Sequence, residues 1–152
     1  MDISSKGKYP SNKLSNFAEH RFILDSVQIN SFEGFLQSLK FKEPEIQREV
    51  CKLVGFAAKK RGSSKKWWKN QTLYWQGVEY KRKSKEYQKL LDKAYYEMYK
   101  QSDSFKKALI ASGDSTLTHK IGKNNKSETV LTKQEFISRL YKLRHHVKEK
   151  LF

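Results

Sequence analysis

The sequence is poor in the residues that shape small secreted or metal-bound domains. Its 152 residues include one cysteine, two prolines and seven glycines. Cys51 alone cannot form an internal disulfide or a thiolate metal cluster. No stretch approaches the roughly 20 apolar residues that span a bilayer, and the first residues lack the apolar segment of a secretory signal. We therefore expect a cytoplasmic protein with no membrane partner, no metal and no cofactor.

Acidic side chains are also scarce. Sixteen Asp and Glu residues stand against 32 Lys and Arg residues, which leaves a net charge of +16. Such a field attracts polyanions and phosphorylated ligands, but it fits a nucleic acid, a nucleotide substrate or a merely lysine-rich surface equally well. The hydrophobic content is 37%, including 13% aromatic residues, which is enough apolar material for a folded core.

Periodicity predicts a helix-rich α+β fold in one domain over residues 1–152, with small antiparallel hairpins. The hairpins are expected to turn at Asp25-Ser26 and at Gln76-Gly77, and residues 116–121 to form a short strand. Helices are expected over 31–41, from Pro44 to near Gly62, after Ser84, over 102–112, and after a capping box made by Thr132 and Glu135. The helix from Pro44 is expected to bury Ile46, Val50, Leu53, Val54 and Ala57.

A polar stripe interrupts the apolar helix at 31–41. Glu33, Gln37 and Lys40 follow one another at i, i+4 and i+7, so they share a helical face. If this face lines a cleft, the Glu33 carboxylate could act as a general base or stabilise a developing cation. Gln37 and Lys40 could bind hydroxyl or phosphate oxygens. An exposed helix face commonly carries the same residue types, and spacing alone favours that alternative.

Five segments occur in an order that is similar to the YbiA-like, or NADAR, family. They are LSNF (14–17), SFEGFLQSLKF (31–41), TLYWQG (72–77), ALIASGDSTLTHKIG (108–122) and VLTKQEFISRLYKLR (130–144). The resemblance implies a YbiA-like fold and hydrolysis of an N-glycosidic bond. The family's substrates are a ribosylaminopyrimidine phosphate of the riboflavin pathway, or ADP-ribose and its conjugates, including ADP-ribose attached to guanine.

The resemblance also implies roles for individual residues. Glu33 matches the catalytic glutamate of the family, and Gly34 stands where the commonest form of the motif has His. Either His119 or Lys40 is a candidate to protonate the departing base. The substrate-binding positions that the resemblance implies are Asn16, Gln37, Lys40, Trp75 and Arg144. Among them, Trp75 matches the tryptophan that stacks on the base in this family.

The stereochemical course stays open at this point. Cleavage of an N-glycoside passes through an oxocarbenium-like sugar, which a carboxylate stabilises electrostatically. Asp114, Glu128 and Glu135 are all possible second carboxylates, so neither retention nor inversion follows.

A basic, aromatic segment lies at residues 59–85, where ten Lys and Arg residues accompany one acidic residue and all three tryptophans. Charge for the backbone and rings for the bases are what a single-stranded nucleic-acid surface uses. Packing of the aromatic rings in the core, with lysines on the surface, is an equally good interpretation. The candidate nucleic-acid or phosphate contacts are Lys65, Lys66, Trp67, Trp68 and Lys69.

Three functional hypotheses follow. The first is an N-glycosidase that acts on a phosphorylated ribose or ADP-ribose-type small molecule, or on ADP-ribosylated nucleic acid. The second is a non-catalytic module that binds ADP-ribose, nucleotides or nucleic acid through the same pocket and basic surface. The third is a structural protein in which the motifs only maintain the fold. No phosphate-binding GxxxxGK[ST] or dinucleotide-binding GxGxxG motif is present.

Overall fold

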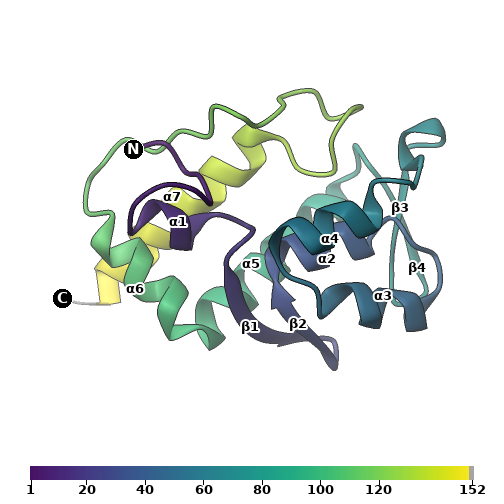
Figure 1. Cartoon of the computed structure of the whole chain (residues 1–152), viewed down its shortest axis with the longest axis horizontal. Helices are drawn as coiled ribbons and strands as arrows, with labels where there is room; N and C mark the ends of the chain where they lie inside the picture. Colours follow the sequence, from purple (N-terminus) through teal and green to yellow (C-terminus); the bar gives the residue numbers. More distant parts are fainter. Residues whose placement is uncertain (151–152) are drawn as a thin grey trace.

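The computed structural model describes residues 1–150 and has the predicted α+β architecture, built of helices and two small antiparallel hairpins (Figure 1). The elements in chain order are α1 (Ser11–Leu14), β1 (Glu19–Leu24), β2 (Val27–Ser31), α2 (Phe32–Ser38), α3 (Pro44–Cys51), α4 (Gly55–Gly62), the 3₁₀ turn η1 (Trp67–Lys69), β3 (Thr72–Trp75), β4 (Val78–Lys81), α5 (Lys85–Gln101), α6 (Asp103–Ala111) and α7 (Lys133–Lys150).

Both hairpins turn where the sequence predicts. Asp25 and Ser26 join β1 to β2 with φ angles of 49° and 67°, and Gln76 and Gly77 join β3 to β4 with φ angles of 45° and 88°. Paired positive φ angles belong to the two-residue turns whose twist matches that of the flanking strands. Along β1 the side chains are alternately exposed and buried, so one face of this hairpin rests on the core.

The single helix expected from Pro44 to Gly62 is wrong. The chain instead forms α3 and α4, with a break between Cys51 and Gly55, whose φ is +59°. Because the break turns the chain, both helices pack against α2. The Leu53 carbonyl accepts a hydrogen bond from Ser31 Oγ at 2.9 Å instead of continuing a helix. Val50 is buried as expected, whereas Ala57 is exposed and Ile46, Leu53 and Val54 are half-buried.

The helices α5 and α7 begin at the expected caps, Ser84 and the Thr132–Glu135 capping box, and α6 begins near residue 102, where a helix is expected. Ser84 Oγ accepts from the Tyr87 amide, and Ser102 Oγ accepts from the Phe105 amide. At the centre of the core the ring of Tyr95 stacks on Phe32, with ring centroids 3.7 Å apart. This stack joins α5 to α2, the helix that carries the predicted polar stripe.

A long connection from Ser112 to Thr132 joins α6 to α7 and arches across one side of the molecule (Figure 1). The strand expected at 116–121 is reduced to a single parallel bridge between Asp2 and Thr118. No helix within residues 1–150 is long and apolar enough to cross a membrane.

Candidate active site

The predicted polar stripe opens into a cavity of about 370 Å³. One wall is α2 with the turn that follows it, a second comes from α4 and η1, and a third is the long connection before α7. Five residues to which the family resemblance gives a role line this cavity together: Asn16, Glu33, Gln37, Lys40 and His119.

Glu33 and Gln37 are tied to each other within α2. Gln37 Nε2 donates to Glu33 Oε1 at 3.0 Å, as their i, i+4 spacing allows. Burial raises the pKa of Glu33, while the hydrogen bond from Gln37 and the charges of Lys40, Lys59 and His119 act in the opposite direction. The Glu33 carboxylate is therefore held in one orientation by Gln37, in a part of the cavity wall that is shielded from water.

Two glycines shape the surroundings of this helix. A Cβ at Gly62 would lie 2.0 Å from Gln37 Oε1, so the bare backbone of α4 makes room for the Gln37 amide. A Cβ at Gly34 would lie 2.7 Å from the Leu53 carbonyl oxygen. Gly34 therefore packs against the connection between α3 and α4, and a larger residue at this position would require that connection to move.

Lysines supply the positive charge of the cavity. Lys40 follows α2 in a turn, with its amide donating to the Gln37 carbonyl at 3.2 Å. Burial lowers the pKa of Lys40, the Glu33 carboxylate opposes this shift, and the charge of Lys59 adds to it. Lys59, from α4, and Lys123, from the long connection, also line the cavity. Sequence reasoning missed Lys59 because α4 was expected to be part of a longer helix.

Asn16 is positioned by the aromatic core. Its Oδ1 accepts from the Tyr95 hydroxyl at 2.8 Å, and its carbonyl accepts from the Glu33 amide at 3.0 Å. With Oδ1 occupied, the Nδ2 group of Asn16 remains as the donor for another partner.

Trp75 and Arg144 lie elsewhere, contrary to the expectation that they contact a ligand in this cavity. Trp75 is buried, packs edge-on against Phe35, and donates from Nε1 to Asp25 Oδ2 at 2.9 Å. Arg144 is buried and donates to Ser112 Oγ at 3.1 Å. The tryptophan that lines the cavity is Trp67, which the basic aromatic pattern singled out for another role.

The structure places the three candidate second carboxylates in different environments. Glu135 is buried against Arg82, and Asp114 is exposed and paired with Lys148. Glu128 lines the cavity on the wall formed by the long connection. Among the described residues, Glu33 and Glu128 are thus the two carboxylates of the cavity lining.

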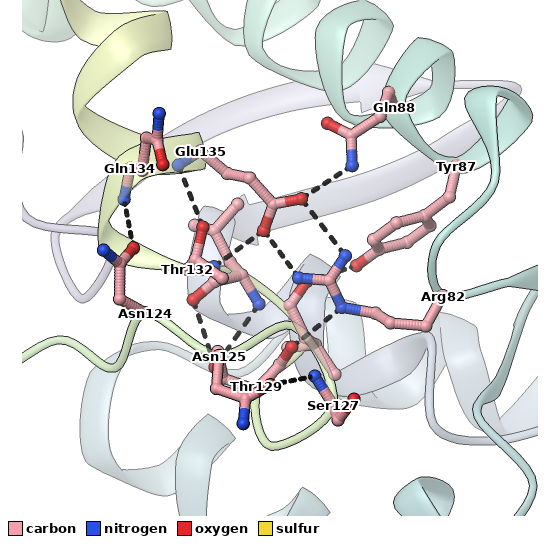
Figure 2. Close-up of polar contacts among 12 residues, drawn as sticks. Arg82, Tyr87, Gln88, Asn124, Asn125, Ser127, Thr129, Thr132, Gln134 and Glu135 are labelled. Carbon is pink, nitrogen blue, oxygen red and sulfur yellow. Dashed lines mark hydrogen bonds and ion pairs between the residues drawn. The ribbon is translucent and has the colours of Figure 1, made fainter.

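A buried network fixes that wall (Figure 2). Arg82 donates to both carboxylate oxygens of Glu135, at 2.6 and 3.1 Å, and from Nε to the Thr129 carbonyl at 2.8 Å. The Tyr87 hydroxyl donates to the Val130 carbonyl at 2.6 Å. Because Thr129 and Val130 line the cavity, Arg82, which directly follows β4, and Tyr87 of α5 hold its wall from behind.

The first turn of α7 also faces this region, but its amides are already used. Thr132 and Glu135 form the predicted capping box, with the Thr132 amide donating to Glu135 Oε1 and the Glu135 amide donating to Thr132 Oγ1. The Lys133 amide donates to the Lys123 carbonyl. The amides of this helix end are therefore not available to a ligand in the cavity.

The basic aromatic segment is divided between cavity and surface. Trp67 is buried in the cavity wall, whereas Trp68 is 50% exposed. Lys65, Lys66 and Lys69 are exposed beside it. No group of three or more His, Cys, Asp and Glu residues within 1–150 is arranged to hold a metal ion. Cys51 is buried, and burial raises the pKa of its thiol to about 12.

Sequence comparison with known proteins finds relatives of this chain in phages. The family model of bacteriophage protein GP30.3 matches residues 8–145. The chain belongs to this family. It is 40% identical over 146 residues to a protein of Enterobacteria phage T4 described as "Uncharacterized 17.1 kDa protein in Gp30-rIII intergenic region", with 95% of this chain and 96% of the T4 protein covered.

The solved structure of Escherichia coli YbiA, determined by NMR, has the same fold. It matches 99% of this chain and 86% of the YbiA chain with a TM-score of 0.63, at 18% sequence identity. The YbiA-like fold expected from the five segments is thereby confirmed. A sequence identity this low carries the fold and not the activity.

Proposed function

We propose that this member of the GP30.3 family is an N-glycosidase that hydrolyses an N-ribosyl bond in a phosphorylated ribose compound, with Glu33 as the catalytic carboxylate. The observation that carries the proposal is the placement of Glu33. Its carboxylate lies in the wall of a cavity of about 370 Å³, is held by Gln37, and faces a group of lysines. Ligand cavities of roughly 300–1,000 Å³ hold small organic molecules.

The chemistry of the cavity matches this substrate class. As the bond from C1 of ribose to nitrogen breaks, positive charge develops on the sugar, and the negative charge of Glu33 stabilises it. Lys59 and Lys123 suit a phosphate group, and the ring of Trp67 offers an apolar surface to a flat base. Lys40 suits protonation of the leaving nitrogen because burial lowers its pKa.

A panel assay with Glu33→Gln tests the proposal. Purified protein is mixed with NAD, riboflavin-pathway ribosylamines and ADP-ribosylated nucleic acid or protein, and the released products are read by mass spectrometry. Glu33→Gln keeps the shape of the side chain but removes its charge, so turnover should fall by about 100- to 1000-fold. Affinity for ADP-ribose, measured by calorimetry, should change little.

Glu45→Gln, which removes an exposed carboxylate from α3, is the matched control and should keep full activity. Hydrolysis by Glu33→Gln at the rate of the unmodified protein would remove Glu33 from the catalytic role. If the unmodified protein binds ADP-ribose but hydrolyses nothing in the panel, a binding module is the better description.

The surface beside the cavity favours a second candidate function, the binding of a nucleic acid. Exposed Trp68 and its three lysine neighbours combine a stacking surface with positive charge, next to the cavity wall at Trp67. A nucleic acid bound there would lie beside the cavity, as an ADP-ribosylated polymer requires.

A further inference from the structure

The N-terminal residues of the described chain are fastened to the loop that carries His119. The Ile3 amide donates to the Thr118 carbonyl at 2.7 Å. Asp2 Oδ1 accepts from Thr118 Oγ1 at 3.0 Å and from the Lys120 amide at 2.8 Å. The Ile3 side chain is fully buried in the core. The position of the Ile3 carbonyl is therefore determined by the core and by the loop together.

That carbonyl selects one form of the His119 ring. His119 Nδ1 lies 2.9 Å from the Ile3 oxygen. A carbonyl oxygen only accepts hydrogen bonds, so Nδ1 carries the proton, and in the neutral ring the lone pair is on Nε2. The ring is held edge-on against Phe136, with centroids 5.1 Å apart, and a Cβ at Gly122 would lie 2.6 Å from its Cδ2. It therefore has little room to rotate.

We propose that His119 accepts the proton of the attacking water through Nε2, and that Asp2 and the Ile3 carbonyl position it for this task. This inference rests on the proposed N-glycosidase function and assigns the two proton transfers of that reaction to different residues. A neutral ring with this tautomer has no proton to give from Nε2. In this division of roles the departing base receives its proton from Lys40.

Protons and electrons balance in the hydrolysis step. The C1–N bond breaks and its electron pair goes to the nitrogen, which takes a proton from the Lys40 ammonium group. The water oxygen forms the new bond to C1 and loses one proton to His119 Nε2. The imidazolium then returns a proton to Lys40 through solvent, so the products are the free sugar and the protonated base, and no redox partner is needed.

Two variants and one spectrum test this assignment. His119→Asn keeps an amide donor near the position of Nδ1 but removes the acceptor at Nε2. On the substrate that the panel identifies, it should lower kcat by about 100- to 10,000-fold with KM nearly unchanged. Asp2→Ala should lower kcat less, and Asp2→Asn, which keeps Oδ1 as an acceptor, should restore it. In ¹⁵N-labelled protein without ligand, NMR should show the His119 proton on Nδ1.

A proton on Nε2, or full activity of His119→Asn while Glu33→Gln is inactive, would overturn the assignment and leave the proposed function standing. If the unmodified protein hydrolyses no N-riboside, the proposed function and the base role fail together. The NMR spectra of the unmodified protein and of Asp2→Ala then decide by themselves whether the N-terminal residues set the tautomer.

Discussion

Arg82 and Glu135 form a two-pronged ion pair in the protein interior, with Nη2–Oε1 and Nη1–Oε2 distances of 2.6 and 3.1 Å. The same guanidinium donates to the Thr129 carbonyl, so a single side chain connects the turn after β4, the cavity wall and the first turn of α7 (Figure 2). The pair therefore links the core to the candidate site.

Glu135→Gln should destabilise the protein strongly, because it leaves the buried Arg82 charge without its partner. Loss of one member of a buried pair typically costs about 3–5 kcal/mol. Glu19→Gln, which removes an exposed pair with Arg21, is the matched control and should cost less than about 1 kcal/mol. Denaturant unfolding at pH 7 measures both. Equal effects of the two variants would contradict the importance of the buried pair.

The same carboxylate should contribute to acid unfolding. Burial alone would raise the pKa of Glu135, but the hydrogen bonds from Arg82, Thr132 and Gln88 lower it to about 2. Since the folded pKa is below the ordinary value of 4.5, the unfolded state takes up the proton first as the pH falls. The stabilisation is present above pH 4.5 and is lost as the pH falls toward about 2. Glu135→Gln should flatten this part of the stability curve.

Gly62→Ala should impair the candidate site although alanine is the better helix former. In an open helix this change stabilises by roughly 0.5–1 kcal/mol. At Gly62, however, the new methyl group would occupy the place of the Gln37 amide and disturb its hydrogen bond to Glu33. We expect a lower unfolding free energy and at least tenfold weaker turnover on the panel substrate.

A double-mutant cycle provides the control for this prediction. In a Gln37→Ala background the obstructing amide is absent, so Gly62→Ala should cost clearly less free energy of unfolding than in the unmodified protein. The same cost in both backgrounds would show that the Gln37 amide is not the reason for glycine at this position.

His20 should make the protein less stable in mild acid. Burial lowers its pKa; the bond to the Lys13 carbonyl opposes this shift, and the charge of Lys13 adds to it. The unfolded state therefore binds a proton near the ordinary pKa of 6.5, while the folded state stays neutral to a lower pH. Stability should fall below pH 6.5, by at most about 1.4 kcal/mol per pH unit.

Variants at two histidines separate this effect from general acid sensitivity. His20→Gln should remove this part of the slope, with some loss of stability at pH 7, because the bonds to Lys13 and Ser104 change. His145→Gln, which removes an exposed contact with Glu149, should change the stability by less than about 1 kcal/mol. Unfolding curves between pH 5 and pH 8, a range chosen around the unperturbed histidine pKa of roughly 6.5, compare the two.

If the surface at Trp68 binds nucleic acid, its affinity should depend steeply on salt. Replacing Lys65, Lys66 and Lys69 by alanine should reduce the slope of log K against log salt by about 0.7 for each phosphate that a lysine no longer neutralises. The exposed lysines Lys89, Lys107 and Lys142 provide a control variant with the same change in charge. Fluorescence anisotropy with a single-stranded oligonucleotide measures both. Equal slopes would show that only net charge matters, and absence of binding at low salt would remove this second function.

Several local features could be predicted because they depend on neighbours in the chain. The turns at Asp25-Ser26 and Gln76-Gly77, the cap at Ser84 and the capping box at Thr132 each act within a few residues. The stripe of Glu33, Gln37 and Lys40 follows from the helical repeat in the same way. The break between α3 and α4 could not be predicted, because it depends on the contact of Leu53 with Ser31, which lies 22 residues earlier in the chain.

The tryptophan of the cavity shows the same limit. Trp67 and Trp75 both stand in aromatic, basic surroundings in the sequence, and neither position reveals which ring will face the cavity. In the structure Trp75 packs against Phe35 and donates a hydrogen bond to Asp25. Trp67, in η1, lines the cavity. The sequence also does not show that Glu135 pairs with Arg82, which is 53 residues away in the chain. Nor does it show that Glu128 is the one of the three candidate second carboxylates that lines the cavity.

Periodicity and hydrogen bonds between near neighbours specify the α+β fold class, the local turns and caps, and the helical face that carries Glu33. The groups that surround this face come from distant parts of the chain, and folding brings them together. It brings Asn16, Lys59, Trp67 and His119 to the cavity, and it keeps Trp75 and Arg144 in the core. The reason is physical: a side chain's burial, its partners and its pKa depend on groups that lie tens of residues away, and packing of the whole chain selects them.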